Sequence, residues 1–408
     1  MRWPIPALMI ASLLLAGCHG GRGGGAIVVS LIGERPDGAA IIEATSESLI
    51  RLDREGQVIP GAAARWAILD DGLDYIFRID DAAGVSAPAA ARRLRESLRR
   101  HRHDPDFAAL GPVESIEGVT RTVVEMRLST PQPDLLPLLA RPEFAIGGTT
   151  GFKVDRPRRD PIMLDPRPGE DAPVPILLRT ERAGRAVARF QSGESDLVTG
   201  GTFNDLPVAR AARPDRKSLR FDPATGLFGF AIRNPGLPAT VRTALSLAID
   251  RDQIVAGIGA PNHLKATTIA GSTLEPPLAE RRAAAMALLH GQTAHIRVAM
   301  PHGPGARLLF AFAAQDWAKV GISAEMVDLQ ARDADLSLID RVAPSATLAL
   351  LACASSAGCD PHDRLALINP PFIPIGAPVR WSLVVPSLDL FTENGLAAHP
   401  LDQLRSRH

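Results

Sequence analysis

The chain of 408 residues is poor in cysteine and in aromatic side chains. It contains 3 cysteines and a single tyrosine, Tyr75, and aromatic residues make up 4% of it. So few rings leave little from which to build the stacking platforms that bind single-stranded nucleic acid. The formal net charge is +0, from 45 basic and 45 acidic residues, so no overall field attracts nucleic acid or an anionic surface. We therefore expect no nucleic-acid partner.

Long apolar runs and catalytic signatures are also missing. No run after Leu15 approaches the ~20 residues of a membrane-spanning helix, so we expect the rest of the chain to be soluble. There is no Gly-x-Ser-x-Gly elbow, no His-Glu-x-x-His motif and no phosphate loop ending in Gly-Lys-Ser/Thr. His101 and His103 are spaced so that their rings would point apart on a helix, which disfavours a metal site. These absences favour a binding protein over an enzyme, without cofactor or metal.

The N-terminus has the features of an exported lipoprotein. Arg2 supplies a short basic start, and residues 5–15 form an almost uncharged stretch of signal-peptide length. Leu-Ala-Gly-Cys at 15–18 fits the four lipobox positions, in which small residues precede the cysteine that bacteria acylate. We predict a signal peptide over 1–17 and a lipid-anchored, glycine-rich tether over 18–25, with the lipid on Cys18. The alternative is an ordinary secretory signal in which Cys18 is incidental.

The other two cysteines, Cys353 and Cys359, lie close together in the sequence. An exported protein meets an oxidising environment, where two neighbouring cysteines favour a disulfide. A zinc site would need two further ligands, and only His362, Asp360 and Asp363 are nearby. The disulfide is therefore the favoured interpretation.

Strand and helix periods alternate along the mature chain. Residues 73–79 alternate apolar with polar or smaller side chains, as in a half-buried strand, and residues 87–98 carry apolar side chains at helical spacing with arginines on the other face. Residues 241–249 form a clean apolar stripe of helical period. The pattern predicts a mixed α/β fold without an internal repeat.

Several segments resemble a known family in the same order along the chain. The longest covers 47–79 and includes ESLIRLDREGQVIPGAAARW. A glycine-rich turn at 148–154, FQSGESDLV at 190–198, VRTALSLAIDRDQI at 241–254 and WAKVGI at 317–322 follow it. Together they are similar to the family 5 extracellular solute-binding proteins, the dipeptide, oligopeptide and nickel receptors of ABC importers. The resemblance spans nearly the whole mature chain.

This resemblance implies an α/β, two-lobed periplasmic-binding-protein fold with an additional inserted domain, of type II and similar to cluster C. The lobes of such a protein close over ligand in a hinge motion. Transferred to this chain, the family's first lobe is discontinuous and comprises 26–45, 146–234 and 374–408. The inserted domain then covers 46–145, and the second lobe covers 235–373.

The resemblance also implies a function. We expect a monomeric, extracytoplasmic receptor that is held to a membrane by its lipid, captures a peptide or peptide-like small molecule, and delivers it to an ABC permease. The alternative is a transport-deficient paralogue that serves as an envelope interaction or scaffold lipoprotein, because the chain is shorter than typical members and lacks one of their ligand anchors.

That missing anchor lies in the second lobe. Peptide receptors of the family carry a Gly-Trp-x-x-Asp motif whose aspartate pairs with the α-ammonium of the ligand. Here the tryptophan position is Ala352, and the aspartate position falls on Ser355 or Ser356. A charge-assisted hydrogen bond contributes about 1.5–3 kcal/mol, so we expect weak binding of simple di- and tripeptides and a preference for ligands without a free ammonium.

Three further residues complete the candidate ligand site. Asp360 follows the missing anchor by a few positions and is either a substitute for it or an ordinary turn residue before Pro361. Glu34 and Arg35 directly follow the first expected strand. The candidate ligand-binding residues are therefore Glu34, Arg35, Ser355, Ser356 and Asp360.

Overall fold

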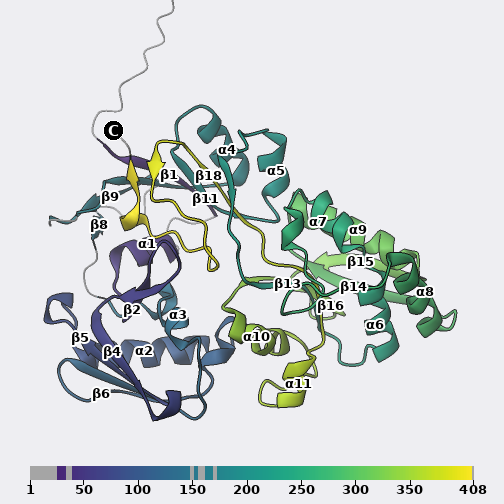
Figure 1. Ribbon diagram of the computed structural model, residues 1–408, viewed down its shortest axis with the longest axis horizontal. Coiled ribbons are helices and arrows are strands. Elements are labelled where there is room, and N and C mark those ends of the chain that lie inside the picture. Colours follow the sequence, from purple (N-terminus) through teal and green to yellow (C-terminus); the bar gives the residue numbers. More distant parts are fainter. Residues whose placement is uncertain (1–24, 34–38, 148–150, 155–160, 169–171, 407–408) are drawn as a thin grey trace, which may run out of the picture.

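The computed structural model describes residues 25–33, 39–147, 151–154, 161–168 and 172–406, and in this part of the chain three larger sheets mark three regions (Figure 1). We name them by their sheets: the first lobe has the seven-stranded sheet, the second lobe the five-stranded sheet, and the inserted domain the four-stranded sheet. In Figure 1 the first lobe lies at the upper left, the inserted domain below it, and the second lobe on the right.

The first lobe is built around the parallel strand β1, which pairs with β10 on one side and β11 on the other. Its apolar sequence IVVSLI suits a central strand that is covered on both faces. The sheet order is β12-β18-β11-β1-β10-β9-β8. The elements of this lobe are β1 (Ile27–Ile32), α1 (Ala39–Thr45), β8 (Phe152–Val154), β9 (Ile162–Pro166), β10 (Ile176–Glu181), α4 (Ala183–Gln191), β11 (Leu197–Thr202), α5 (Leu206–Ala211), β12 (Leu219–Phe221), β18 (Arg380–Val384), β19 (Leu388–Asp389), η7 (Leu401–Gln403) and β20 (Arg405–Ser406).

The second lobe has the sheet order β15-β14-β16-β13-β17, in which β14 is parallel to both neighbours. The predicted stripe at 241–249 becomes α6, which buries Val241, Ala244, Leu245 and Ala248 in the main core. The elements are β13 (Gly226–Ile232), α6 (Ala239–Ala248), α7 (Arg251–Gly257), η5 (Asn262–Leu264), α8 (Leu278–Leu289), β14 (Ala294–Met300), α9 (Pro304–Ala318), β15 (Ile322–Asp328), β16 (Leu336–Val342), η6 (Ser345–Thr347), α10 (Leu348–Ser355), α11 (Arg364–Ile368) and β17 (Phe372–Gly376).

The inserted domain packs one long helix, α2, on an antiparallel sheet of order β4-β5-β7-β6. The helix predicted over 87–98 is confirmed, and it buries Ala87, Ala90, Ala91 and Leu94 while its arginines are exposed. The elements are β2 (Ile50–Leu52), β3 (Val58–Pro60), β4 (Ala63–Leu69), η1 (Asp70–Gly72), β5 (Asp74–Ile79), η2 (Asp81–Ala83), α2 (Ala87–His101), η3 (Pro105–Leu110), β6 (Val113–Gly118), β7 (Val123–Leu128), α3 (Leu135–Leu139) and η4 (Pro142–Phe144).

Two chain segments connect the sheets of the two lobes, and they correct two expected boundaries. One segment leads from β12 into β13 and the other from β17 into β18, and the Asp222 backbone N–H donates to the Arg380 carbonyl between them, at 3.1 Å. β13 therefore lies in the five-stranded sheet, although 226–232 were expected in the first lobe, and β17 is not divided at residue 374. The reason is that an apolar strand such as GLFGFAI would be equally buried in either sheet.

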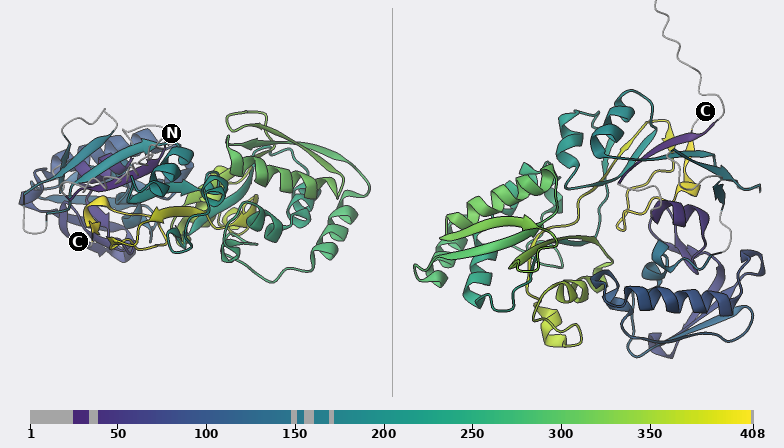
Figure 2. Two further views of the ribbon diagram at one scale, coloured as in Figure 1. Left: turned by 90° about the horizontal axis from the view of Figure 1, so that it is seen from above. Right: turned by 180° about the vertical axis from the view of Figure 1, so that it is seen from behind.

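The two connecting segments lie side by side between the lobes in both orientations of the ribbon (Figure 2). Among the helices that the structure describes, none is both long and apolar enough to cross a bilayer.

Candidate ligand-binding cleft

A cavity of about 740 Å³ opens where the two lobes and the inserted domain meet. Its size is that of a small-molecule site, and the carboxyl end of β11 reaches it, as in other open α/β sheets. Strand β16 lines it from the second lobe, and Pro105 lines it from the inserted domain. The lining consists of Pro105, Thr202, Phe203, Asn204, Arg233, Pro301, Leu329, residues 337–341 and residues 354–357.

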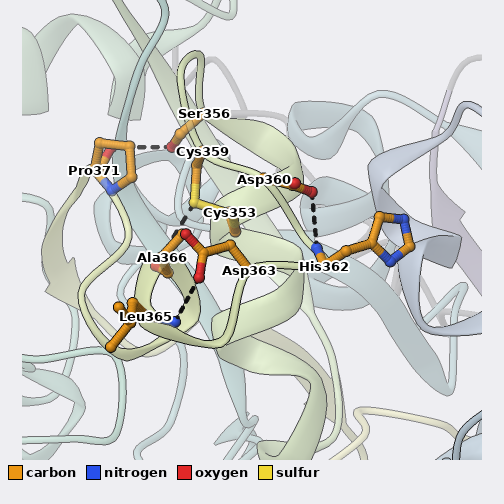
Figure 3. The surroundings of a disulfide bond; sticks show 9 residues. All are labelled: Cys353, Ser356, Cys359, Asp360, His362, Asp363, Leu365, Ala366 and Pro371. Atoms are coloured by element: carbon orange, nitrogen blue, oxygen red, sulfur yellow. Dashed lines mark hydrogen bonds between the residues drawn. A yellow bond between two sulfur atoms is a disulfide. The ribbon is translucent and has the colours of Figure 1, made fainter.

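The structure brings Ser355 and Ser356 to this cavity, at the end of α10. The Ser356 hydroxyl donates to the Pro371 carbonyl at 3.0 Å (Figure 3). The hydroxyl groups of Ser355 and Ser337 have no hydrogen-bond partner among the described residues, although both residues are largely buried. Two hydroxyls of the cavity lining are therefore available to a ligand.

Asp360 does not lie in the cavity, which corrects its assignment as a candidate ligand residue. It is exposed, and its Oδ1 accepts the backbone N–H of His362 at 2.9 Å (Figure 3). This contact is the local turn of an aspartate before proline, which holds the carboxylate to its own loop. Of the two interpretations of Asp360, the surface turn is therefore the one that the structure supports.

The Cys353–Cys359 disulfide, with an S–S distance of 1.98 Å, closes the short loop that contains the cavity-lining residues 354–357 (Figure 3). Its Cys353 end is fully buried in α10, and the Cys359 sulfur lies 3.7 Å from the Ala366 carbonyl of α11. The crosslink thus restrains both the cleft wall and the loop that leads to α11. Cys18, Glu34 and Arg35 lie outside the described residues.

Two of the three charged side chains that line the cavity already have partners of opposite charge. Asp340 accepts two bonds from Arg380 Nη1, at 2.8 and 3.0 Å, and this pair joins β16 of the second lobe to β18 of the first. Burial raises the pKa of Asp340, and Arg380 opposes the rise. Arg341 Nε lies 2.9 Å from Asp106 Oδ1 of the inserted domain.

Arg233 is the third charged side chain of the lining, and it directly follows β13. It is exposed, and none of the described carboxylates forms an ion pair with it. Because the charges of Asp340 and Arg341 are compensated, Arg233 leaves the cavity with an excess positive charge. Guanidinium groups bind carboxylates and phosphates through paired hydrogen bonds, so this cleft is suited to an anionic group.

Asn204 holds the two lobes together beside the cavity. Its Nδ2 donates to the His302 carbonyl at 2.7 Å, and its Oδ1 accepts the Ala306 N–H at 3.0 Å. Helix α9 begins after Gly303, which has no side chain to cap it, so the first-lobe asparagine caps a second-lobe helix. The cap would be lost if the lobes separated here, and it therefore stabilises the arrangement of the lobes in this structure.

A second cavity, of about 500 Å³, adjoins the first and shares Asp340 and Arg341 with it. Glu43 of α1 lines this second cavity. Burial raises the pKa of Glu43 from an ordinary value of 4.5 to about 7; Arg51 and His399 oppose the rise, and Asp402 adds to it. Arg51 is engaged by Asp402, at 2.5 Å, which leaves Glu43 without a close counterion.

Glu43 predicts a pH dependence of stability. Because its folded pKa lies above its unfolded value, its contribution is fully present below about pH 4.5 and is lost as the pH rises through about 7. Glu43→Gln should therefore raise the free energy of unfolding at pH 8 relative to wild type, by up to about 3 kcal/mol, and change it little at pH 4.5. Thermal unfolding across this range tests it. The exposed Glu55→Gln is the control, and an equal gain there would contradict the assignment.

Metal binding finds no support in the described residues, where no cluster of three His, Cys, Asp or Glu side chains could hold an ion. Arg233, Asn204 and Asp340 were not predicted from the sequence as residues of the cleft. Arg233 directly follows β13 and Asn204 lies two residues after β11, and this position at the carboxyl end of a strand was the only available signal. Asp340 lies within a strand and gives no such signal.

Two α/β lobes joined by two adjacent connections, with a cavity between them, define the two-lobed fold of periplasmic binding proteins with an additional domain. Solved structures share this fold over nearly the whole chain. OppA from Haemophilus influenzae, in complex with the peptide RPPGFSPFR, matches with a TM-score of 0.73 and 15% identity, covering 94% of this chain and 99% of that one. This likeness confirms the fold that the family resemblance implies.

Two further structures show the range of ligands that such proteins bind. The murein tripeptide binding protein MppA from Escherichia coli matches with a TM-score of 0.71 and 15% identity over 95% of this chain and 99% of that one. NikZ from Campylobacter jejuni, in complex with Ni(L-His), matches with a TM-score of 0.66 and 16% identity over 89% and 94%. Neither a family model nor a curated protein matches the sequence.

Proposed function

We propose that this protein is a family 5 solute-binding receptor of an ABC importer, exported, lipid-anchored through Cys18 and monomeric, that captures a peptide-like small molecule. The observation that carries the proposal is the cavity of about 740 Å³ between the lobes, lined by residues of all three regions. A molecule bound there would contact both lobes at once and would stabilise their closed arrangement.

Ligand binding by the purified protein tests the proposed function. Thermal-shift screening of free peptides, blocked peptides and other small molecules, followed by calorimetry of the hits, should yield a ligand that raises the unfolding midpoint. The double substitution Ser337→Leu and Ser355→Leu, which fills the cavity wall, should abolish the shift. A ligand whose affinity is unchanged in that variant would place binding elsewhere and contradict the proposal.

The charge of the cleft makes the ligand prediction more specific. Arg233 is uncompensated and the anchoring aspartate of the family is absent, so a free ammonium gains no partner here while a carboxylate does. We expect N-acetylated dipeptides with a free carboxylate to bind more tightly than unmodified dipeptides. Arg233→Gln should lower the affinity for the acetylated dipeptide by about tenfold or more, which is the equivalent of one charge-assisted hydrogen bond.

Two controls accompany the Arg233 measurement. Arg216→Gln removes an exposed first-lobe arginine that does not line the cavity and should leave affinity unchanged. The C-terminal amide of the same acetylated dipeptide should bind wild type and Arg233→Gln equally. Sub-micromolar binding of unmodified dipeptides by calorimetry would disprove the predicted preference.

A further inference from the structure

The inserted domain has a strongly basic surface that the ligand cleft does not use. Six arginines and a single acidic residue, Glu96, lie between positions 92 and 102. Four of these arginines follow helical spacing on one face of α2 and its C-cap, and we name them the α2 stripe: Arg92, Arg95, Arg99 and Arg102. The other two, Arg93 and Arg100, flank the stripe.

The stripe points away from the domain because the opposite face of α2 forms its core. Ala87, Ala90, Ala91 and Leu94 are buried, and the helix packs on β6 and β7. All four stripe arginines are exposed. The side-chain hydrogen bonds of the stripe in the described part of the chain do not go to carboxylates. Arg95 donates to the Ile116 carbonyl, and Arg102 Nε lies 2.9 Å from His103 Nε2.

No carboxylate of the described residues forms an ion pair with the stripe. Charges that alternate in sign along the face of a solvent-exposed helix compensate one another. Here the whole chain is neutral, with 45 basic and 45 acidic residues, yet positive charge is concentrated along one helix. A row of uncompensated guanidinium groups creates a local field that attracts a polyanionic partner.

We propose that the α2 stripe docks on the anionic headgroups of a phospholipid membrane. The stripe requires a partner with many negative charges in a plane, and the proposed lipid anchor places this protein at such a surface. Each basic residue near an anionic membrane surface adds a similar increment of binding free energy. Such binding does not require apolar side chains to enter the bilayer. This fits α2, whose apolar face is buried in the domain.

A membrane fits the stripe better than nucleic acid does. The exposed face of α2 carries no aromatic side chain on which bases could stack. The inserted domain and strand β1, which the N-terminal tether precedes, both lie on the side of the cleft away from the second lobe (Figure 1). Docking through α2 would hold that side on the membrane and leave the second lobe free to move against it.

Vesicle co-sedimentation tests the proposal without the lipid anchor. The chain from His19 onward retains every described element and is mixed with phosphatidylcholine vesicles with and without phosphatidylglycerol. We expect binding only to the vesicles with phosphatidylglycerol, and binding should fall as salt is added. The variant Arg92→Gln/Arg95→Gln/Arg99→Gln/Arg102→Gln should bind at least about tenfold more weakly.

The matched control removes the same charge elsewhere. Arg182, Arg216, Arg332 and Arg364 are exposed and unpaired by the described carboxylates, and their combined replacement by glutamine should leave vesicle binding intact. Equal unfolding midpoints of both variants establish that each is folded. Equal losses in the two variants, binding to phosphatidylcholine alone, or tighter binding to duplex DNA than to anionic vesicles would each overturn the proposal. Ligand binding in the cleft does not enter these measurements.

Discussion

Replacing Arg380 by alanine is expected to destabilise this protein by about 3 kcal/mol, because it leaves the Asp340 carboxylate buried without its counterion. Arg380 Nη1 donates to both Asp340 oxygens, and its Nη2 lies 3.4 Å from the Asp340 carbonyl. Both side chains are largely buried, at 19% and 15% exposure. Since β16 and β18 belong to different lobes, the substitution should also weaken the junction between the lobes.

Urea unfolding of four variants measures this effect. Arg380→Ala and Asp340→Ala should each be strongly destabilised, whereas the double variant should lose less than the sum of the two, because no unpaired charge remains. The pair Arg220–Glu393 on the neighbouring strand is more exposed, at 47% and 30%, and Arg220→Ala should cost less than about 1 kcal/mol. Additive losses in the double variant would show that the two charges do not stabilise each other.

The second large effect concerns the location of the protein. Cys18→Ser removes the thiol that the lipobox presents for acylation, so nearly all of the protein should move from the membrane fraction to the soluble extracytoplasmic fraction. The membranes should be washed at high salt, which screens the α2 stripe and leaves the lipid as the remaining anchor. Mass spectrometry of the N-terminal peptide of wild type should show acyl chains on Cys18.

Ala16→Ser is a suitable control for the Cys18 substitution, because it keeps a small residue before the cysteine and should leave the protein in the membrane fraction. Wild-type protein that is already soluble after the salt wash would disprove the lipid anchor.

Several features of this protein could be predicted from the pattern of residues that are close together in the sequence. Apolar side chains at helical spacing predicted α2 and α6 in place, because helix burial depends on neighbours three and four positions away. The α/β class followed from the alternating strand and helix periods, the two-lobed fold was implied by the resemblance to a known family, and the structure has both. The proximity of Cys353 and Cys359 favoured the pairing that the structure contains, because six positions along a helix end and a turn keep two cysteines within bonding distance.

The amino-acid sequence thus determined the class of the fold, its helices and the crosslinked loop, all of which depend on residues that are close along the chain. The tertiary structure alone decided which sheet receives β13, that Asp340 faces Arg380, that Asn204 caps α9 from the other lobe, and that Asp360 turns away from the cleft. Asn204 and Ala306 are 102 positions apart, and Asp340 and Arg380 are 40 apart. Periodicity reports whether a side chain is buried, but its partner is set by how separate strands and helices pack, and so the charge of the cleft could be read only from the folded chain.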